Sequence, residues 1–473
     1  MNGAAASIEL AALRARHLPP TPFTLALRGR EPLVAEQVYR HLPGRRLGFR
    51  ARAGGEALLV KLFLRRRDYG RECAGLELLH AHGVPSPAIR WHHRCGGAWL
   101  LATEFLPDAY GLAGHLDTAD ADADTDADVG AVLALLGALH RAGLIQRDAH
   151  LDNFLIRDSV AHAIDGAGIR RVRGARALRA NLALLLAQFP PAWDARLRGL
   201  LGHYGGLDDD AALRRDWRGA RLRRLRDYRR KCVRSCTEFV AERSWRHFAA
   251  RRRDRGDAGF LELLADPERA VAAAPRLKDG NTATVVRISG AARDLVVKRY
   301  NVKDWRHGLR RALRRSRAWT SWQSANLLQH IGVPTPRALG LREVRWGPFR
   351  LVTYLITEAS AGAPLQEWLP ARGAPVPPWL DRALLATFAA LAAAGLSHGD
   401  LKASNFLVEE ADQRLLLIDL DAVCLHRSER HARRALERDR ERFLANWDGA
   451  LHRHFDQLLA PLALAGRQRR QES

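Results

Sequence analysis

Cysteine, lysine and methionine are scarce in this chain of 473 residues, and long apolar runs are missing. The five cysteines are scattered, and the closest pair, Cys232 and Cys236, has neither CxxC spacing nor a histidine cluster nearby. This usage indicates no metal centre and is typical of a reducing compartment. No stretch approaches 18 consecutive apolar residues, so we expect no membrane-spanning helix. The first twenty residues lack the pattern of a signal peptide, and we therefore expect a cytoplasmic protein.

Negative charge is in the minority, because 76 Lys and Arg face 52 Asp and Glu and give a net charge of +24. Only six of the basic residues are lysines. Such a balance favours anionic partners, which include nucleic acid, an acidic membrane surface and phosphorylated substrates. No zinc-finger, helix-turn-helix or RNP pattern accompanies the charge, so we do not expect nucleic acid. The hydrophobic content of 47% is that of a globular protein with a substantial core.

The most informative stretch is LSHGDLKASNFLVEEADQRLLLIDLDAV, residues 396–423. Asp400 precedes Asn405 by five residues, and Asp419 ends a short apolar strand. This is the spacing of a phosphotransferase catalytic loop, in which one carboxylate acts as base and an amide and a second carboxylate hold Mg²⁺. Lys402 would neutralise charge on the transferred phosphoryl group. The alternative is an ordinary polar turn between two strands.

The same elements occur twice along the chain. HGVPSP at 82–87 resembles IGVPTP at 331–336, and AGLIQRDAHLDNFLI at 142–156 resembles AGLSHGDLKASNFLV at 394–408. The order is kept while the offset between the copies grows slowly, which is typical of a diverged duplication. We therefore predict two tandem domains, 1–235 and 236–473.

Each copy is predicted to be α+β, with a small antiparallel-sheet lobe, a larger helical lobe and an active site between them. Strands at 98–105 and 349–357 lead to an acidic hinge position, Glu104 or Glu358, and apolar helices follow at 131–142 and 380–394. The charge-rich stretch 229–275 reads as containing the linker. The Asp-rich segment 117–130 reads as a solvated loop.

The motifs KDGNTATV, VVKRY, SRAWTSWQSANLLQHIGVPTPRAL, YLITE, HGDLKASNFLV and LLIDLDAV resemble the bacterial lipopolysaccharide kinase family. The resemblance covers most of 277–425 and is weaker over 42–168. It implies a protein-kinase-like fold, ATP as donor, Mg²⁺ as cofactor, and a Kdo or heptose hydroxyl of a lipid A–core intermediate as acceptor. It also places the protein at the cytoplasmic face of the inner membrane.

The resemblance assigns roles to individual residues of both copies. In the C-terminal copy Lys298 would grip the nucleotide phosphates, the turn Gly280-Asn281-Thr282 would cover them, and Glu358 would lie at the nucleotide hinge. The catalytic residues would be Asp400 and Lys402, with Asn405 and Asp419 as metal ligands. The corresponding residues of the N-terminal copy are Lys61 and Glu72 for the nucleotide, Asp148 as base, and Asn153 and Asp165 for the metal.

The two copies depart from the protein-kinase pattern in different ways. Protein kinases pair the strand lysine with a helix glutamate. Glu72 fits that role in the first copy, whereas the aligned position in the second is Ser321. The first copy has His150 in place of Lys402. We expect the C-terminal copy to carry the main activity, and a regulated protein kinase is disfavoured because no APE-like segment follows.

Residues 301–323 combine arginines with Trp305, Trp319 and Trp322 at helical spacings. Such a helix suits an anionic membrane surface or the phosphates of the acceptor, and we expect Arg310, Arg311, Arg314 and Arg315 to contribute. The alternative is a solvated helix with its aromatic face packed on the small lobe. Two other functions also stay open. One is a non-catalytic pseudokinase scaffold for core assembly, and the other is a small-molecule phosphotransferase of the aminoglycoside or choline kinase type.

Overall fold

The computed structural model describes residues 6–7, 21–95, 97–118, 123–205, 210–280, 283–289, 293–301, 315–373 and 375–464. The chain forms two compact units, residues 1–188 with 195–217 and residues 189–194 with 218–473. These units differ from the predicted domains mainly in residues 218–235, which belong to the second unit. The predicted mixture of helix and antiparallel sheet is confirmed. No helix among the described residues combines the length and apolar character that a bilayer crossing needs.

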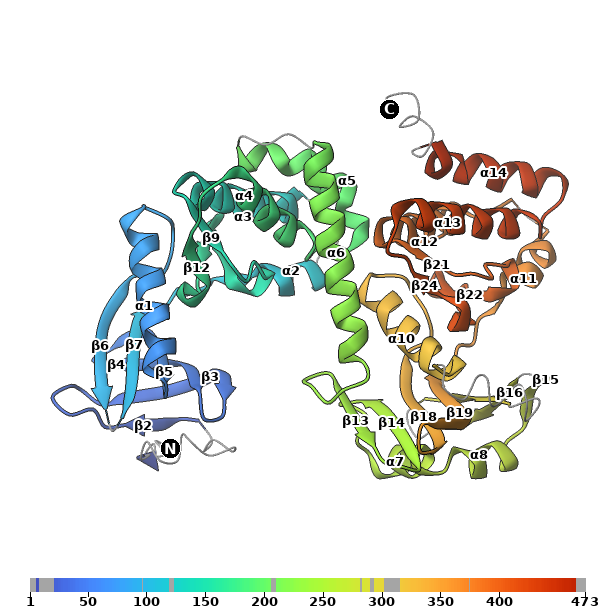
Figure 1. The fold of residues 1–473 in the computed structure, drawn as a ribbon, viewed down its shortest axis with the longest axis horizontal. Helices are drawn as coiled ribbons and strands as arrows, with labels where there is room; N and C mark the ends of the chain where they lie inside the picture. Colours follow the sequence, from blue (N-terminus) through green and yellow to red (C-terminus); the bar gives the residue numbers. More distant parts are fainter. Residues whose placement is uncertain are drawn as a thin grey trace. The chain divides into compact units, whose positions relative to one another are not determined.

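A seven-stranded sheet begins the first unit (Figure 1). All neighbours are antiparallel except the pair β1–β2. In spatial order the strands are β1 (Ala6–Ser7), β2 (Phe23–Leu25), β3 (Leu33–Leu42), β4 (Arg46–Ala53), β5 (Glu56–Phe63), β7 (Ala98–Glu104) and β6 (Ile89–Cys95). The turn between β4 and β5 needs positive φ at two successive residues, which Gly54 (54°) and Gly55 (86°) supply.

Helices and short strands complete the first unit. Helix α1 (Arg66–Ala81) packs on β5 and β7 and buries Leu76 and Leu79. The remaining elements are β8 (Tyr110–Gly111), α2 (Leu112–Thr118), α3 (Ala123–Arg141), β9 (Leu144–Gln146), β10 (Phe154–Arg157), β11 (Val160–Ala163), β12 (Ile169–Arg171), α4 (Ala175–Leu186), α5 (Asp194–Leu200) and α6 (Ala211–Lys231). Helix α6 runs from the first unit into the second.

The Asp-rich segment is not a solvated loop beyond residue 122, because Ala123 begins α3. Thr125 and Asp128 are buried, and Asp128 accepts a hydrogen bond of 2.7 Å from the Tyr110 hydroxyl. Acidic residues near a helix N-terminus are stabilised by the helix dipole. The alternating aspartates therefore start a helix, while residues 119–122 lie outside the described part of the chain.

The second unit has its own seven-stranded sheet, which is antiparallel throughout. In spatial order the strands are β13 (Phe239–Arg243), β14 (His247–Arg252), β18 (Ala338–Trp346), β19 (Phe349–Glu358), β17 (Leu295–Tyr300), β16 (Ala283–Ile288) and β15 (Arg276–Gly280). Most of the stretch 229–275, within which the linker was predicted, is therefore regular structure. Two of its segments are sheet strands, because Phe239 and Phe248 are fully buried core residues. Two more form helices α7 (Ala258–Ala265) and α8 (Pro267–Ala273), which contact the sheet.

The helical part of the second unit surrounds the stretch that the sequence singled out. It comprises α10 (Arg317–His330), β20 (Ala363–Pro364), α11 (Leu365–Arg372), α12 (Pro378–Ala394), β21 (Leu396–Ser397), β22 (Phe406–Glu409), β23 (Arg414–Leu417), β24 (Cys424–Leu425), α13 (Glu429–Leu444) and α14 (Gly449–Leu464). Helix α12 ends at Ala394, and the next residue, Gly395, has a φ of 69° that stops the helix directly before the predicted catalytic stretch.

Two tryptophans of the predicted membrane helix are core residues. Trp319 and Trp322 lie on α10 and are buried, and the Trp322 indole donates a hydrogen bond of 2.7 Å to the Cys232 carbonyl. The aromatic face of this helix therefore packs inside the unit, as the alternative interpretation stated. Arg315 is described and exposed. Trp305, Arg310, Arg311 and Arg314 lie outside the described residues.

Candidate functional site

The catalytic stretch of the second unit folds as a loop between β21 and β22. The Asn405 amide nitrogen donates a hydrogen bond of 2.7 Å to the Asp400 carbonyl. This bond holds the predicted base, Asp400, in a defined position relative to the predicted metal ligand, Asn405. Lys402 reaches the Asp400 carboxylate at 3.0 Å, and both side chains are partly exposed. A carboxylate and an ammonium group are therefore both open to a substrate at this loop.

Lys298 on β17 contacts Asp419, with 2.6 Å between Nζ and Oδ1. Asp419 adopts a left-handed backbone conformation, with φ of 60° and ψ of 56°, which is uncommon outside glycine and most tolerated by Asn and Asp. Burial acts to raise the pKa of Asp419, but Lys298 and, after it, Arg317 bring that pKa below its ordinary value. Burial likewise opposes charge on Lys298, yet Tyr300 and Asp419 leave its pKa above the usual value. Both groups are thus charged, and the strand lysine takes a predicted metal ligand as its partner.

Two buried side chains, Asp439 and His398, hold this loop, and sequence reasoning predicted this role for neither of them. The Asp439 carboxylate on α13 is fully buried and accepts hydrogen bonds from the backbone N–H groups of His398 (2.6 Å) and Gly399 (3.0 Å). His398 is also buried, and its Nε2 lies 2.9 Å from the Ile418 carbonyl, one residue before Asp419. A carboxylate at position 439 falls on the apolar stripe formed by Ala432, Ala435 and Phe443. That helical spacing was the signal that could have found it.

The remaining predicted residues of this copy are placed only in part. Gly280 ends β15, and its carbonyl lies 3.4 Å from the Asn301 amide nitrogen. Asn281 and Thr282 lie outside the described residues. The Glu358 carboxylate contacts Arg255, Arg293 and Arg337 at 3.2 to 3.6 Å. Because these arginines already pair with the carboxylate, Glu358 would contact a nucleotide through its main-chain N–H or carbonyl group. The nucleotide-binding role of Glu358 stays a prediction.

The catalytic loop of the first unit shows the same internal bonding. The Asn153 amide nitrogen donates a hydrogen bond of 2.7 Å to the Asp148 carbonyl. Asp165 is extended, with φ of −118°, and its carboxylate accepts a hydrogen bond from the Ala167 N–H. The Asp165 carbonyl accepts a hydrogen bond of 2.9 Å from Gln146, the residue at the position of His398. The two loops thus differ chiefly in the backbone of the second aspartate.

Lys61 and Glu72 form a close ion pair in the first unit, with 2.5 Å between Nζ and Oε1. Lys61 also donates to the Ile164 carbonyl at 2.8 Å, next to Asp165. The Glu72 side chain is completely buried and accepts hydrogen bonds from the N–H groups of Gly166 and Ala167. Burial raises the pKa of Glu72, and Lys61 counteracts that effect.

Glycine makes this arrangement possible. A Cβ at Gly75 of α1 would lie 1.8 Å from the Gly166 carbonyl oxygen, so the helix can approach the segment after Asp165 only without a side chain. In the second unit Ser321 lies on α10, and its hydroxyl contacts the Tyr300 hydroxyl at 2.9 Å. Among the described residues Lys298 therefore has no carboxylate of α10 as its partner, and Asp419 takes that place.

A cavity of about 530 Å³ opens in the first unit beside two of the predicted residues, Asp148 and Asp165. It is lined by residues of β3, the β3–β4 turn, the start of α1, the catalytic loop and the segment through β12. Asp148 and Asp165 thus face a common space, which is the arrangement that the sequence predicted for a base and a metal ligand.

The donor atoms suit a nucleotide-bound Mg²⁺ in both units. Carboxylate and amide oxygens are the protein ligands this ion takes, and it usually keeps one or two of them together with substrate phosphates. Among the described residues no three His, Cys, Asp or Glu side chains gather into a ready-made metal site. Asn405 and Asp419 would hold the ion in the second unit, and Asn153 and Asp165 in the first.

Comparison with known proteins agrees with this chemistry for one part of the chain. Residues 264–454 match the model of the lipopolysaccharide kinase (Kdo/WaaP) family. No curated protein matches the sequence. Among solved structures, a crystal structure of the M. tuberculosis PknI kinase domain matches with 16% identity and a TM-score of 0.25, over 32% of this chain and 70% of that one. The chain is a phosphotransferase, and residues 264–454 carry its similarity to the lipopolysaccharide kinases.

Proposed function

We propose that the chain transfers the γ-phosphoryl group of ATP to a heptose or Kdo hydroxyl of the lipopolysaccharide inner core. The observation that carries the proposal is the cluster of Asp400, Lys402, Asn405, Asp419 and Lys298 inside the matched segment. Asp400 would accept the proton of the sugar hydroxyl, and Lys402 would offset charge on the transferred group. Lys298 would leave Asp419 for the nucleotide phosphates, and Asp419 with Asn405 would hold Mg²⁺.

The experiment is transfer to a defined acceptor. Purified chain, ATP and Mg²⁺ are incubated with inner-core lipopolysaccharide stripped of phosphate, and mass spectrometry locates the new phosphate on heptose or Kdo. Kanamycin and choline serve as alternative acceptors. Phosphorylation of either small molecule but not of the core would favour a small-molecule phosphotransferase, and no transfer to any acceptor would favour a scaffold.

The proposal includes two kinase-like copies in tandem. Equivalent hydrogen bonds support it, because the Asn–Asp bond of the loop measures 2.7 Å in both units. The Pro85 carbonyl accepts from the Ala163 N–H at 3.0 Å, and the Pro334 carbonyl accepts from the Leu417 N–H at 2.9 Å. These prolines belong to the repeated GVPxP motif. A chance repetition of apolar segments would not reproduce such long-range contacts.

The proposal also places the protein at an anionic membrane surface in the cytoplasm. Its support is a pair of exposed tryptophans, Trp245 in the β13–β14 turn (67% exposed) and Trp346 at the end of β18 (65% exposed). The two turns lie side by side, since the Gly347 N–H donates to the Trp245 carbonyl at 3.0 Å. The exposed Arg243 and Arg246 flank Trp245. Tryptophan beside arginine suits the boundary between anionic headgroups and acyl chains.

We expect the double variant Trp245→Ser/Trp346→Ser to bind anionic vesicles about tenfold or more weakly, because burying one large apolar side chain contributes roughly 1.5–3 kcal/mol. Sedimentation with phosphatidylglycerol-containing vesicles measures the effect, and added salt should weaken the parent. Leu277→Ser is the matched control, since Leu277 is similarly exposed (59%) on β15, at the opposite edge of the same sheet. Parental binding by the double variant would remove these tryptophans from the membrane contact.

A further inference from the structure

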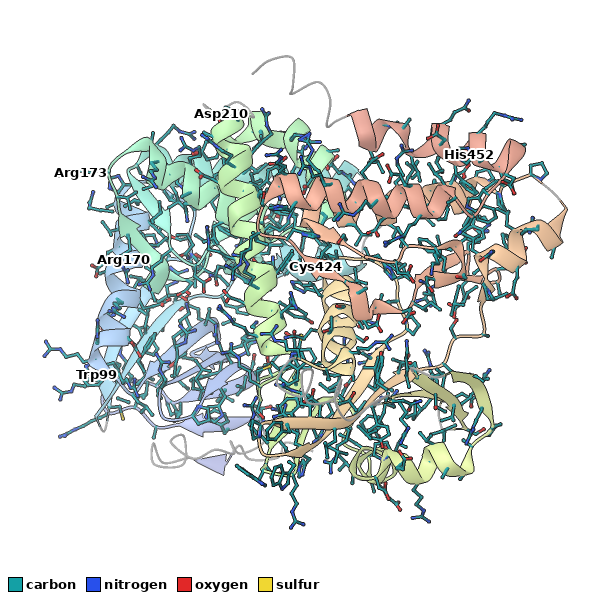
Figure 2. The ribbon with its side chains drawn as sticks, turned by 45° about the vertical axis from the view of Figure 1, so that its right-hand side comes forward. Trp99, Arg170, Arg173, Asp210, Cys424 and His452 are labelled. Carbon is teal, nitrogen blue, oxygen red and sulfur yellow. The ribbon has the colours of Figure 1, made fainter. Side chains whose placement is uncertain are left out.

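Arginines are the most frequent residues in the lining of the cavity of the first unit. Figure 2 labels one of them, Arg170 on β12. The arginines are contributed by strands, a turn, a helix and the catalytic loop, so that separate parts of the unit converge on one space. They are Arg40, Arg45, Arg46, Arg71, Arg147 and Arg170, and the acidic residues of the lining are Asp68, Asp148 and Asp165.

Only two of these six arginines have an acidic partner among the described residues. Arg45 contacts Asp68 at 3.5 Å and Arg46 contacts Glu72 at 3.9 Å, while Arg170 donates to a backbone carbonyl. No acidic side chain of the described chain lies within 4.0 Å of the guanidinium nitrogens of Arg40, Arg71 or Arg147. With Arg170, these are the arginines whose positions are not explained by ion pairs among the described residues.

Gathering like charges around a partly enclosed space is unfavourable unless an anion occupies it. The guanidinium group presents a planar fork of donors that matches phosphate oxygens in pairs, and it stays charged at any physiological pH. The six guanidinium groups outnumber the three aspartates of the lining by three, so an anion of more than one charge is needed to balance them. The arrangement therefore suits a ligand with more than one phosphate group.

A nucleotide is the less suitable source of these phosphates. Lys61, the residue that the resemblance assigns to nucleotide phosphates, is not part of the cavity lining, and its ammonium group lies against Glu72 and the Ile164 carbonyl. The cavity instead borders Asp148, the predicted base, beside which an acceptor hydroxyl would lie.

We propose that this cavity binds a sugar acceptor that already carries at least two phosphate groups, held by Arg71 and Arg147 next to Asp148. The assignment of the sugar as an acceptor rests on the proposed function, whereas the binding of its phosphates does not. The first unit would thus contribute recognition of a phosphorylated glycan, whichever unit performs the transfer.

Calorimetry on the full chain without nucleotide tests the proposal, with glucose 1,6-bisphosphate as the probe and glucose as its uncharged counterpart. We expect the bisphosphate alone to bind, and the variant Arg71→Ala/Arg147→Ala to lose about a hundredfold in affinity, since a hydrogen bond to a charged group contributes roughly a factor of ten or more. Arg173→Ala is the control, because Arg173 is exposed in the same unit outside the lining and is labelled in Figure 2. Arg71→Lys/Arg147→Lys, which keeps the charge but loses the fork, should bind with intermediate affinity.

A saturating non-hydrolysable ATP analogue with Mg²⁺ distinguishes acceptor from donor. Retained bisphosphate binding supports a separate acceptor site, whereas displacement would assign the arginines to the nucleotide and overturn the proposal. Absence of binding at low salt, or parental affinity in a folded double alanine variant, would overturn it as well. Since the readout is binding, failure of phosphate transfer in the assay described above would leave this result interpretable.

Discussion

Asp400→Asn in the full-length chain is expected to lower kcat for phosphate transfer about 10²–10⁴-fold, the usual contribution of a positioned general base. The amide has nearly the shape of the carboxylate, so the loop should keep its bond between Asn405 and the carbonyl of residue 400. The charge opposite Lys402 and the proton acceptor are both lost. Initial rates of phosphate incorporation into the inner-core acceptor, at saturating ATP, provide the measurement.

The matched control is Asp412→Asn, because Asp412 is an exposed acid in the turn between β22 and β23 of the same unit. Its rate should equal that of the parent. Asp148→Asn measures the share of the first unit in the same assay. Parental activity of the Asp400 variant beside an inactive Asp148 variant would place the transfer in the first unit and contradict the expected division of labour.

Glu72→Ala is expected to lower the free energy of unfolding of the first unit by about 3–5 kcal/mol, as the loss of one partner from a buried ion pair typically does. The Glu72 carboxylate is completely buried and is the hub for the Lys61 ammonium and the N–H groups of Gly166 and Ala167. Its removal leaves a largely buried ammonium without its counter-charge. Hydrogen exchange of the α1 amides, followed by mass spectrometry, reports on this unit separately from the second.

Glu77→Ala is the control on the same helix, because its side chain is exposed. In this variant the free energy of opening, obtained from the exchange of the α1 amides, should stay within a few tenths of a kcal/mol of the parent value, as is usual for surface positions. Glu72→Gln keeps the volume and one acceptor oxygen while removing the charge and the second acceptor, so its effect should fall between the two. Equal protection in Glu72→Ala and Glu77→Ala would show that the ion pair does not support the helix.

The local geometry of the catalytic stretch was accessible from the sequence, because apolar strands on both sides of a polar turn leave little freedom in where its side chains lie. The predicted strand and helix positions around Glu104 and Glu358 differ from the observed ends by no more than a few residues, apart from α3, which begins earlier. The partners of charged groups were less accessible. Asp419 was predicted as a metal ligand, and only the folded chain shows its left-handed backbone presenting the carboxylate to Lys298.

Arginine content explains the largest differences between the sequence-based expectations and the structure. The linker was placed within 229–275 because that stretch is rich in charged residues. Edge strands and amphipathic helices need only one apolar face, however, and Phe239, Phe248, Phe260 and Leu264 supply it. The arginines of 301–323 likewise favoured a membrane-surface helix, and of this segment the structure describes Trp319 and Trp322 as core residues, whereas 302–314 lie outside the described part of the chain. In an arginine-rich sequence, amphipathic helices and strands are therefore missed when charge content is considered before the spacing of the apolar residues.

In the second unit Lys298 and Asp419 pair with each other, so each occupies the position that a phosphate or a metal ion would take. A phosphate that drew Lys298 away alone would leave the Asp419 carboxylate without its counter-charge, and a cation that drew Asp419 away alone would do the same to Lys298. When both bind, the phosphate supplies the counter-charge of Lys298 and the cation supplies that of Asp419. The binding free energies of phosphate and cation are therefore coupled, and the coupling is reciprocal. The second unit is thereby arranged to respond to nucleotide and metal as a pair, with a weak response to either one alone.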